Sequence, residues 1–327
     1  MIDDEIVITR TPLRISFIGG GTDMPYFYNK NGGATISCTI NRYIYVTVKF
    51  HNNYQEKYRL NYSETENVNN LEKIKNLRIK FVIKRLKIKK PLYINTFADL
   101  PANSGLGSSS SFTVGLIKAL AKLDNQFFSV TQLAEMAYEI EAKITNNSLG
   151  KQDHYIAAYG GFNYIKYQKN NILISPISLN QKELVNFEKC ISLIWTGKSR
   201  TASTVLDDQK SNFKKNFNSL KKINILSQEF KNEIKKNNIN KKKIGKIIAR
   251  SWELKKNFSK FVTNNYINAL YKILLNYGSY GGKLLGAGNG GFILSLSSQS
   301  TIRKIKKKLK KNKILQVKID KSGSVFL

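Results

Sequence analysis

The segment PANSGLGSSSS, residues 101–111, carries residue types that can bind a phosphate group without a lysine. Gly105 and Gly107 lack a Cβ atom, so the backbone there can approach a phosphate oxygen closely. The segment stands between a strand-like stretch and an amphipathic stretch with helical spacing. A helix N-terminus presents unpaired N–H groups and the positive end of the helix dipole, which together attract phosphate. The alternative interpretation is a capped helix after a turn.

Three further segments supply the other parts that phosphoryl transfer needs: TPLRISFIGGGTD at 11–23, GKQDHYIAAYGGF at 150–162 and GAGNGGF at 286–292. The first contains a cation, Arg14, and a carboxylate, Asp23. The second contains the carboxylate of Asp153, and Glu141 lies near the end of the preceding predicted helix. Phosphoryl transfer uses a phosphate cradle, a metal held by oxygen ligands, a charge-stabilising cation and a residue that orients the acceptor. The combination therefore predicts this chemistry.

Each of these residues also has a purely structural interpretation. Asp153 could cap a helix, Glu141 could be a solvated helix residue, and Arg14 could be a surface cation on a strand. Asp23 could be an Asx-turn residue after the glycines. The phosphoryl-transfer chemistry would be absent only if the structural interpretation were correct for all four residues at once. We therefore favour the functional interpretation.

Strands and helices are predicted around these residues from hydrophobic periodicity. Strands are expected at 13–18, 40–50 and 91–100, and a helix after the 101–107 loop. A further helix should begin at Ser129, where Gln132 completes a capping box. In the second half we expect a strand at 190–195, basic helices over 205–277, a strand at 292–297, a helix at 300–312 and a closing strand at 314–320.

This order of elements predicts an α+β protein with two domains, residues 1–185 and residues 186–327. The chain has 327 residues, which is long enough for two hydrophobic cores. Its two cysteines are far apart, and we expect them to be structural thiols. Only two histidines, His51 and His154, are present, which makes a Ser-His-Asp triad or a histidine metal centre improbable.

The formal net charge of +32 raises the question of nucleic-acid binding. The lysines occur together with many asparagines and isoleucines, and all three are favoured by A+T-rich codons. The basic runs also have apolar residues at helical spacing, as in Ile302, Ile305 and Leu309, which is typical of a solvated helix face. We therefore expect no nucleic-acid partner. We expect no membrane partner and a cytoplasmic location, because no export signal or long apolar stretch is present. A homodimer is left open.

The three motifs, in this order and spacing, resemble the GHMP kinases, which include galactokinase, homoserine kinase and mevalonate kinase. The resemblance covers almost the whole chain. It implies an N-terminal domain like domain 2 of ribosomal protein S5 and a ferredoxin-like C-terminal domain. Within the family, the segments RTPLRISFIGGGTD, GKQDHYIAAYGGF and TGKSRTAS are most similar to the bacterial D-glycero-D-manno-heptose 7-phosphate kinases. Galactokinases carry Gly-Glu-His-Thr-Asp at 19–23, and the missing Glu and His argue against galactose.

The resemblance also implies roles for individual residues. Asp153 would accept or orient the proton of the acceptor hydroxyl, and Arg14 would stabilise the transferred charge. Ser109 and Glu141 would be the Mg²⁺ ligands. ATP would be bound by Ser104, Gly105, Leu106, Gly107, Ser108 and Ser109, beside a wall formed by Gly286, Gly288, Gly290 and Gly291. The sugar would contact Gly20, Gly21, Thr22 and Asp23.

A phosphate on the acceptor would need further cations. The basic residues nearest to the motifs are Arg42, Lys151, Lys198 and Arg200, and arginine is favoured because its guanidinium binds phosphate in a bidentate manner. The expected activity is ATP-dependent phosphorylation of the anomeric hydroxyl of D-glycero-D-manno-heptose 7-phosphate. It would give the 1,7-bisphosphate for nucleotide-activated heptose and surface polysaccharide. The alternatives are a sugar-1-kinase for a free hexose or deoxyhexose, a catalytically silent ligand-binding regulator, and a nucleic-acid-binding protein.

Overall fold

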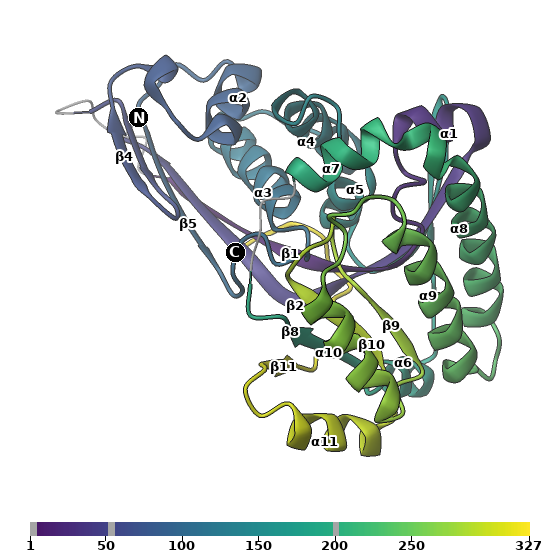
Figure 1. Ribbon diagram of the computed structural model, residues 1–327. Coiled ribbons are helices and arrows are strands. Elements are labelled where there is room, and N and C mark those ends of the chain that lie inside the picture. The colour runs from purple at the N-terminus through teal and green to yellow at the C-terminus, as the bar shows by residue number, and fades with distance from the viewer. Residues whose placement is uncertain (1–4, 52–55, 199–202) are drawn as a thin grey trace.

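The computed structural model of the chain describes residues 5–51, 56–198 and 203–327, which form two sheets covered by helices (Figure 1). The larger sheet has eight strands in the order β12-β1-β2-β5-β3-β4, with β6 paired to β2 and β7 paired to β6. Only the β3–β5 pair is parallel among these described strands. The strands are β1 (Ile6–Ile18), β2 (Gly33–Phe50), β3 (Tyr58–Asn61), β4 (Thr65–Val68), β5 (Leu92–Ala98), β6 (Phe162–Gln168), β7 (Asn171–Pro176) and β12 (Val325–Phe326).

The smaller sheet is antiparallel and has four strands in the order β11-β8-β10-β9. Its strands are β8 (Ile191–Trp195), β9 (Gly281–Leu284), β10 (Phe292–Leu296) and β11 (Ile314–Leu315). Helices follow the first and third of these strands, so the connectivity is that of a ferredoxin-like β-α-β-β-α-β unit. The α+β prediction is confirmed.

Helices cover the long β1–β2 pair. In Figure 1, α2, α3, α4 and α5 lie above this pair, and the smaller sheet with α10 and α11 lies below it. The helices are α1 (Pro25–Asn31), α2 (Leu77–Leu86), α3 (Ser108–Leu123), α4 (Val130–Ile144), α5 (Gln152–Tyr159), α6 (Gln181–Glu188), α7 (Ser203–Ser211), α8 (Phe213–Ile234), α9 (Lys241–Lys256), α10 (Asn265–Asn276) and α11 (Gln299–Lys308), with a short 3₁₀ helix at Leu71–Lys73. Among the described helices, none combines the length and apolar character needed to cross a bilayer.

The alternation of side chains along β1 separates the core from the functional face. Leu13, Ile15 and Phe17 are fully buried in the main hydrophobic cluster. Arg14 and Ser16 point to the opposite face, because successive strand residues alternate, and both line a large cavity. The same strand therefore anchors the fold and supplies a cation to the cavity.

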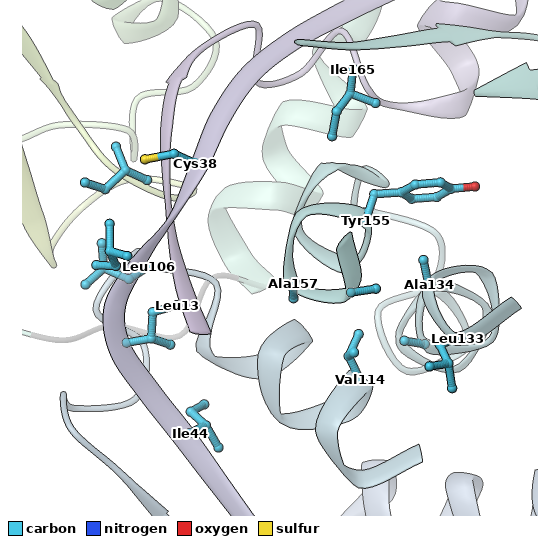
Figure 2. Packing of buried hydrophobic residues seen from close by; sticks show 14 of the residues in the cluster. Leu13, Cys38, Ile44, Leu106, Val114, Leu133, Ala134, Tyr155, Ala157 and Ile165 are labelled. Atoms are coloured by element: carbon cyan, nitrogen blue, oxygen red, sulfur yellow. The ribbon is translucent and has the colours of Figure 1, made fainter. Parts of the chain in front are cut away.

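Helix α3 packs tightly on β1 and is enclosed by its neighbours. Gly115 makes the contact with β1 close, because a Cβ atom there would lie 2.6 Å from Thr11 Oγ1. Figure 2 shows Val114 of α3 pointing toward Ala157 of α5 and toward Leu133 and Ala134 of α4, all within one cluster. This packing fixes the position of the α3 N-terminus.

Most of the predicted elements are present. The helix after the 101–107 loop is α3, and the capping box of Ser129 and Gln132 is confirmed at the start of α4. The features that were not predicted include α1, α6, the β3–β4 and β6–β7 hairpins, β9 and β12. The closing strand expected at 314–320 is wrong in extent, because β11 has only two residues.

The chain end crosses back to the larger sheet. Thr9 of β1 pairs with Phe326 of β12, and a bridge joins Ile40 to Ile319. The proposed boundary near residue 185 lies within α6, between the last strand before it and the first strand of the smaller sheet. We retain two domains meeting near residue 185 as a proposal, with the final residues adjoining the first domain.

Candidate active site

One cavity of about 660 Å³ brings together the glycine loops, Arg14 and the three predicted carboxylates. Segments from both halves of the chain line it, including the start of α3, the start of α5, and residues of α7, α9 and β9. This volume is typical of a small-molecule binding site. The predicted residues that line it are Arg14, Gly20, Gly21, Asp23, Gly105, Gly107, Ser108, Ser109, Glu141, Asp153, Gly286, Gly288 and Gly290.

The N-terminus of α3 opens into the cavity. Gly107 is the N-cap residue with φ of 74°, and no side chain there caps the helix. The capped-helix alternative is therefore wrong for this segment. The N–H groups of the first turn and the positive end of the helix dipole remain directed at the cavity, which suits an anionic ligand.

The second glycine loop rests directly on the first. A Cβ atom on Gly286 would lie 2.7 Å from Gly105 Cα, and one on Gly291 would lie 2.3 Å from the carbonyl oxygen of Ser104. The backbone N–H of Phe292 donates to that same carbonyl at 3.0 Å. The glycines therefore serve this loop-to-loop contact, because side chains would force the two loops apart.

Arg14 joins the first loop to Asp153. Its Nε donates to Asp153 Oδ1 at 2.7 Å and its Nη2 donates to Asp153 Oδ2 at 2.5 Å. Its Nη1 donates to the carbonyl of Gly105 at 2.6 Å. Arg14 is buried, so it is no surface cation, and Asp153 does not cap α5. A bidentate pair of this kind holds both side chains in one orientation.

The ion pair determines the charge of Asp153. Burial raises the pKa of Asp153, but the Arg14 guanidinium and its hydrogen bonds outweigh burial and hold the pKa below its ordinary value. Asp153 is therefore an anion at neutral pH and a weak base. A weak base of this kind orients a hydroxyl better than it removes the proton.

Glu141 collects donors from three helices. Its Oε1 accepts from Arg78 Nε at 2.5 Å and from Thr113 Oγ1 at 3.0 Å. Its Oε2 accepts from Ser109 Oγ at 3.3 Å and from Ser110 Oγ at 3.1 Å, and lies 3.1 Å from His154 Nε2. Glu141 is buried, which contradicts the solvated-helix alternative. The two predicted metal ligands therefore lie side by side.

The donor set suits Mg²⁺, which prefers oxygen ligands and keeps several ligands from water or substrate phosphate. Burial raises the pKa of Glu141, but the hydrogen bond from His154 and the Arg78 charge lower it far below its ordinary value. In the described part of the chain, no cluster of three or more His, Cys, Asp or Glu residues forms a complete metal cage. A metal here would depend on phosphate oxygens to complete its coordination.

Asp23 links the first glycine turn to α5. Its Oδ1 accepts from the N–H of Gly21 at 2.9 Å, and its Oδ2 accepts from the N–H of Gln152 at 3.1 Å. Burial, and then the nearby Asp153 charge, raise its pKa above the ordinary value, against the effect of these hydrogen bonds. The carboxylate fits closely over Gly150, where a Cβ atom would lie 2.0 Å from Oδ2. Asp23 thus positions backbone and also borders the cavity.

Some predicted residues lie elsewhere. Thr22 is fully buried, and its hydroxyl donates to the carbonyl oxygens of Gly19 and Ala34, so it does not reach the cavity. Ser104 and Leu106 are also fully buried and contribute backbone rather than side chains. Figure 2 shows Leu106 in the hydrophobic core near Leu13. The expected sugar contact is therefore corrected for the Thr22 side chain, whereas the burial of Ser104 and Leu106 is compatible with the backbone role predicted for residues 104–109.

Of the cations expected to hold an acceptor phosphate, the three that the structure describes do not line the cavity. Arg42 donates to the carbonyl of Asn41, and Lys151 forms an ion pair with Glu135 at 2.6 Å; neither lines the cavity. Lys198 is exposed on a turn. Arg200 lies outside the described residues. The sequence prediction is therefore corrected for Arg42 and Lys151, which are committed to other partners.

Three cavity cations were missed from the sequence: Arg78 on α2, Lys255 on α9 and Lys283 on β9. Arg78 and Lys255 lie in basic helical stretches, where no pattern distinguishes them from solvated neighbours. Lys283 had a signal, because it is a lone charged residue in the apolar stretch GGKLLGAG. A charge in a strand bounded by glycines indicates a buried functional position.

Comparisons with known proteins agree with this architecture. The sequence models of the GHMP kinases N terminal domain and the GHMP kinases C terminal match residues 73–161 and 233–315. The D-glycero-alpha-D-manno-heptose 7-phosphate kinase of Campylobacter jejuni subsp. jejuni serotype O:2 is 30% identical over 298 residues, which is 87% of each chain.

Two solved structures show the same fold over 98% of both chains. One is a D-glycero-D-manno-heptose 1-phosphate kinase from Bacteroides thetaiotaomicron, with a TM-score of 0.80 and 23% identity. The other is a putative sugar kinase from Campylobacter jejuni, with a TM-score of 0.70 and 27% identity. The two-domain architecture is therefore shared along almost the whole length of the chain.

Proposed function

The chain belongs to the GHMP kinase family, and on that premise we propose that it phosphorylates the anomeric hydroxyl of D-glycero-D-manno-heptose 7-phosphate. Family membership makes it a phosphotransferase with an alcohol acceptor that uses ATP, and the similarity to heptose phosphate kinases supports a sugar as that acceptor. The proposed product is the 1,7-bisphosphate, a precursor of nucleotide-activated heptose. The observation that carries the choice of acceptor is the similarity to the Campylobacter heptose 7-phosphate kinase over 87% of both chains.

We assign the phosphates of ATP to the α3 N-terminus and the two packed glycine loops. Gly105, Gly107, Ser108 and Ser109 line the cavity, and the helix dipole adds positive potential. Ser109 and Glu141 would hold Mg²⁺, which supplies neutralisation of charge on the phosphate oxygens when bound. Glu141 already accepts hydrogen bonds on both oxygens, so metal binding requires at least one of these donors to move.

Asp153 would receive a hydrogen bond from the acceptor hydroxyl and orient its oxygen toward the phosphoryl group. Arg14 holds Asp153 in place through two hydrogen bonds and also contacts Gly105 of the phosphate loop. The acceptor and the donor loop are therefore positioned by one side chain. Such positioning accounts for much of the rate acceleration in phosphoryl transfer, where the protein does little covalent chemistry.

The experiment is ADP release from Mg·ATP with a panel of acceptors: heptose 7-phosphate, heptose 1-phosphate, free heptose, galactose and fucose. We expect the largest kcat/KM with heptose 7-phosphate, and a product phosphorylated at C1 by ³¹P NMR. Heptose 1-phosphate tests phosphorylation at a hydroxyl other than the one at C1, because its C1 oxygen already carries a phosphate. A kcat/KM for a free sugar equal to that for heptose 7-phosphate would contradict the proposal. The absence of ADP release with every acceptor in the panel would favour the catalytically silent alternative.

A further inference from the structure

Lys283 is a buried lysine in the cavity wall without a partner. It is the third residue of β9, and only 3% of its surface is exposed. No hydrogen bond or ion pair connects its ammonium group to any residue in the described ranges. Burying an unpaired ammonium is unfavourable by several kcal/mol, so such a position requires a reason. Burial, and then the nearby Lys255 and Arg14, lower its pKa well below the ordinary value.

Lys255 lies beside it because α9 packs closely on β9. A Cβ atom on Gly281 of β9 would lie 2.0 Å from the carbonyl oxygen of Gly245 of α9, so this contact admits only glycine. The ammonium of Lys255 lines the same cavity and donates to the carbonyl of Gly286 at 2.6 Å. Burial, followed by the Arg14 charge, lowers the pKa of Lys255 to about 8.

The charges around the two lysines are not balanced. Arg14 is neutralised by Asp153 through its bidentate pair. The remaining carboxylate that acts on both lysines is Asp23, and it already accepts two backbone N–H groups. Three cations, Arg14, Lys255 and Lys283, thus face two carboxylates in the described part of the chain: Asp153, which is paired with Arg14, and Asp23, which already accepts backbone N–H groups. A dianion placed between Lys255 and Lys283 would satisfy both ammonium groups.

We propose that Lys283 and Lys255 form a phosphate-binding subsite in the wall of the active-site cavity. The inference rests on the proposed function, since it gives a phosphorylated substrate its cations after Arg42 and Lys151 were found to be engaged elsewhere. The shared chemistry is a phosphate group, which can come from two sources. It is either the phosphate of the acceptor sugar or the phosphoryl group transferred from ATP.

The test uses Lys283→Met, which keeps an unbranched side chain one heavy atom shorter than lysine and removes the charge. The variant should unfold at the same temperature as the wild type or higher, because it no longer buries an unpaired ammonium. The stabilisation that inorganic phosphate gives to the wild type should be lost. Lys118→Met is the matched control: Lys118 is a half-buried lysine outside the cavity that donates to the carbonyl of Ser324. This control should lower stability and retain the response to phosphate.

Kinetics then distinguish the two sources. Hydrogen bonds to charged groups are worth enough to predict a loss of about tenfold to one hundredfold in kcat/KM. A higher KM for the sugar phosphate, with the KM for ATP unchanged, assigns the subsite to the acceptor. A lower kcat with both KM values unchanged assigns it to the transferred group. Lys255→Met should affect the same parameter as Lys283→Met.

Two results overturn the proposal. One is a Lys283→Met protein that is less stable than the wild type or does not fold, which identifies a structural lysine. The other is a phosphate response or a set of kinetic constants that neither variant changes. Binding of inorganic phosphate is measured without turnover, so it remains readable if no acceptor in the panel is phosphorylated. Failure of the proposed function and failure of the subsite are thereby separate outcomes.

Discussion

Asp153 and Arg14 form one unit at the centre of the cavity. Asp153→Asn removes the negative charge and replaces one acceptor oxygen by a donor, so the bidentate pair with Arg14 cannot form. We expect kcat to fall by about one hundredfold or more. The KM for ATP should stay within about threefold, because Asp153 does not contact the phosphate loop. Steady-state kinetics at saturating acceptor measure both constants.

Asp207→Asn is the matched control for the loss of charge. Asp207 lines the same cavity from α7, but its side chain is exposed. The control should retain kcat within about threefold. An Asp153→Asn enzyme with a wild-type kcat would remove Asp153 from the catalytic role. Thermal unfolding of both variants shows whether a loss of activity reflects unfolding, since Arg14 remains buried without its anion.

Arg14 and Asp153 were predicted from the sequence, whereas the cavity lysines Lys255 and Lys283 were not. The difference has a physical reason. Arg14 and Asp153 lie in short motifs whose glycines and charges carry local information. Lys255 lies beside Lys256 at the end of a lysine-rich helix, so its burial depends on the fold rather than on its pattern. Thr22 shows the opposite error: it belongs to a motif, but its hydroxyl completes the glycine turn.

The two glycine loops act as one element because they touch through backbone. Gly105 has φ of 83°, and a Cβ atom there would lie 2.6 Å from the carbonyl oxygen of Leu285. Gly105→Ala therefore adds a backbone clash to the cost of a left-handed residue. We expect unfolding free energy to fall by about 2–5 kcal/mol, the sum of the left-handed and overpacking terms. The KM for ATP should rise as the loops separate.

Gly197 offers a control with nearly the same backbone conformation. Its φ is 81°, and a Cβ atom there would meet nothing within 4 Å. Gly197→Ala should lower the unfolding free energy by only about 1–2 kcal/mol, the cost of the left-handed conformation. Urea denaturation measures both variants. Equal losses for the two would show that the contact between the loops contributes nothing measurable.

Elements with local signals were predictable, and elements that depend on distant partners were not. The start of α4 follows from Ser129 and Gln132, whose capping box needs only four consecutive residues. Strand β12 has two residues and exists through its pairing with β1 at the other end of the chain. Strand β9 contains two glycines, which weaken any strand signal, yet Gly281 allows the close packing of α9 and Gly282 allows the close approach of β10.

The net charge of +32 is carried in part by solvated helix faces, of which α11 is an example. In α11, Ile302 and Ile305 are buried, whereas Lys306, Lys307 and Lys308 are exposed. This agrees with the prediction of a solvated helix face. A positive surface also raises the local concentration of anionic substrates such as ATP and sugar phosphates. The charge is therefore compatible with a kinase and requires no nucleic acid.

The core of the molecule crosses the proposed domain boundary near residue 185. The ring of Phe17 in β1 lies 5.8 Å from Phe230 of α8 and 5.7 Å from Phe187 of α6. These residues belong to a single buried cluster that also includes strands of both sheets. Separate unfolding of either half would expose this shared apolar surface. The two proposed domains should therefore unfold together.

Two probes test this cooperativity in urea. Both tryptophans of the chain, Trp195 and Trp252, follow the boundary, so their fluorescence reports on the second half. Far-UV circular dichroism reports on helices in both halves. We expect the two transitions to share one midpoint and one slope, as two-state unfolding requires. Phe230→Ala should shift both curves together, by about 3–5 kcal/mol. A dichroism transition at a different urea concentration from the fluorescence transition would show that the halves are independent, and the shared cluster would then be a weak interface.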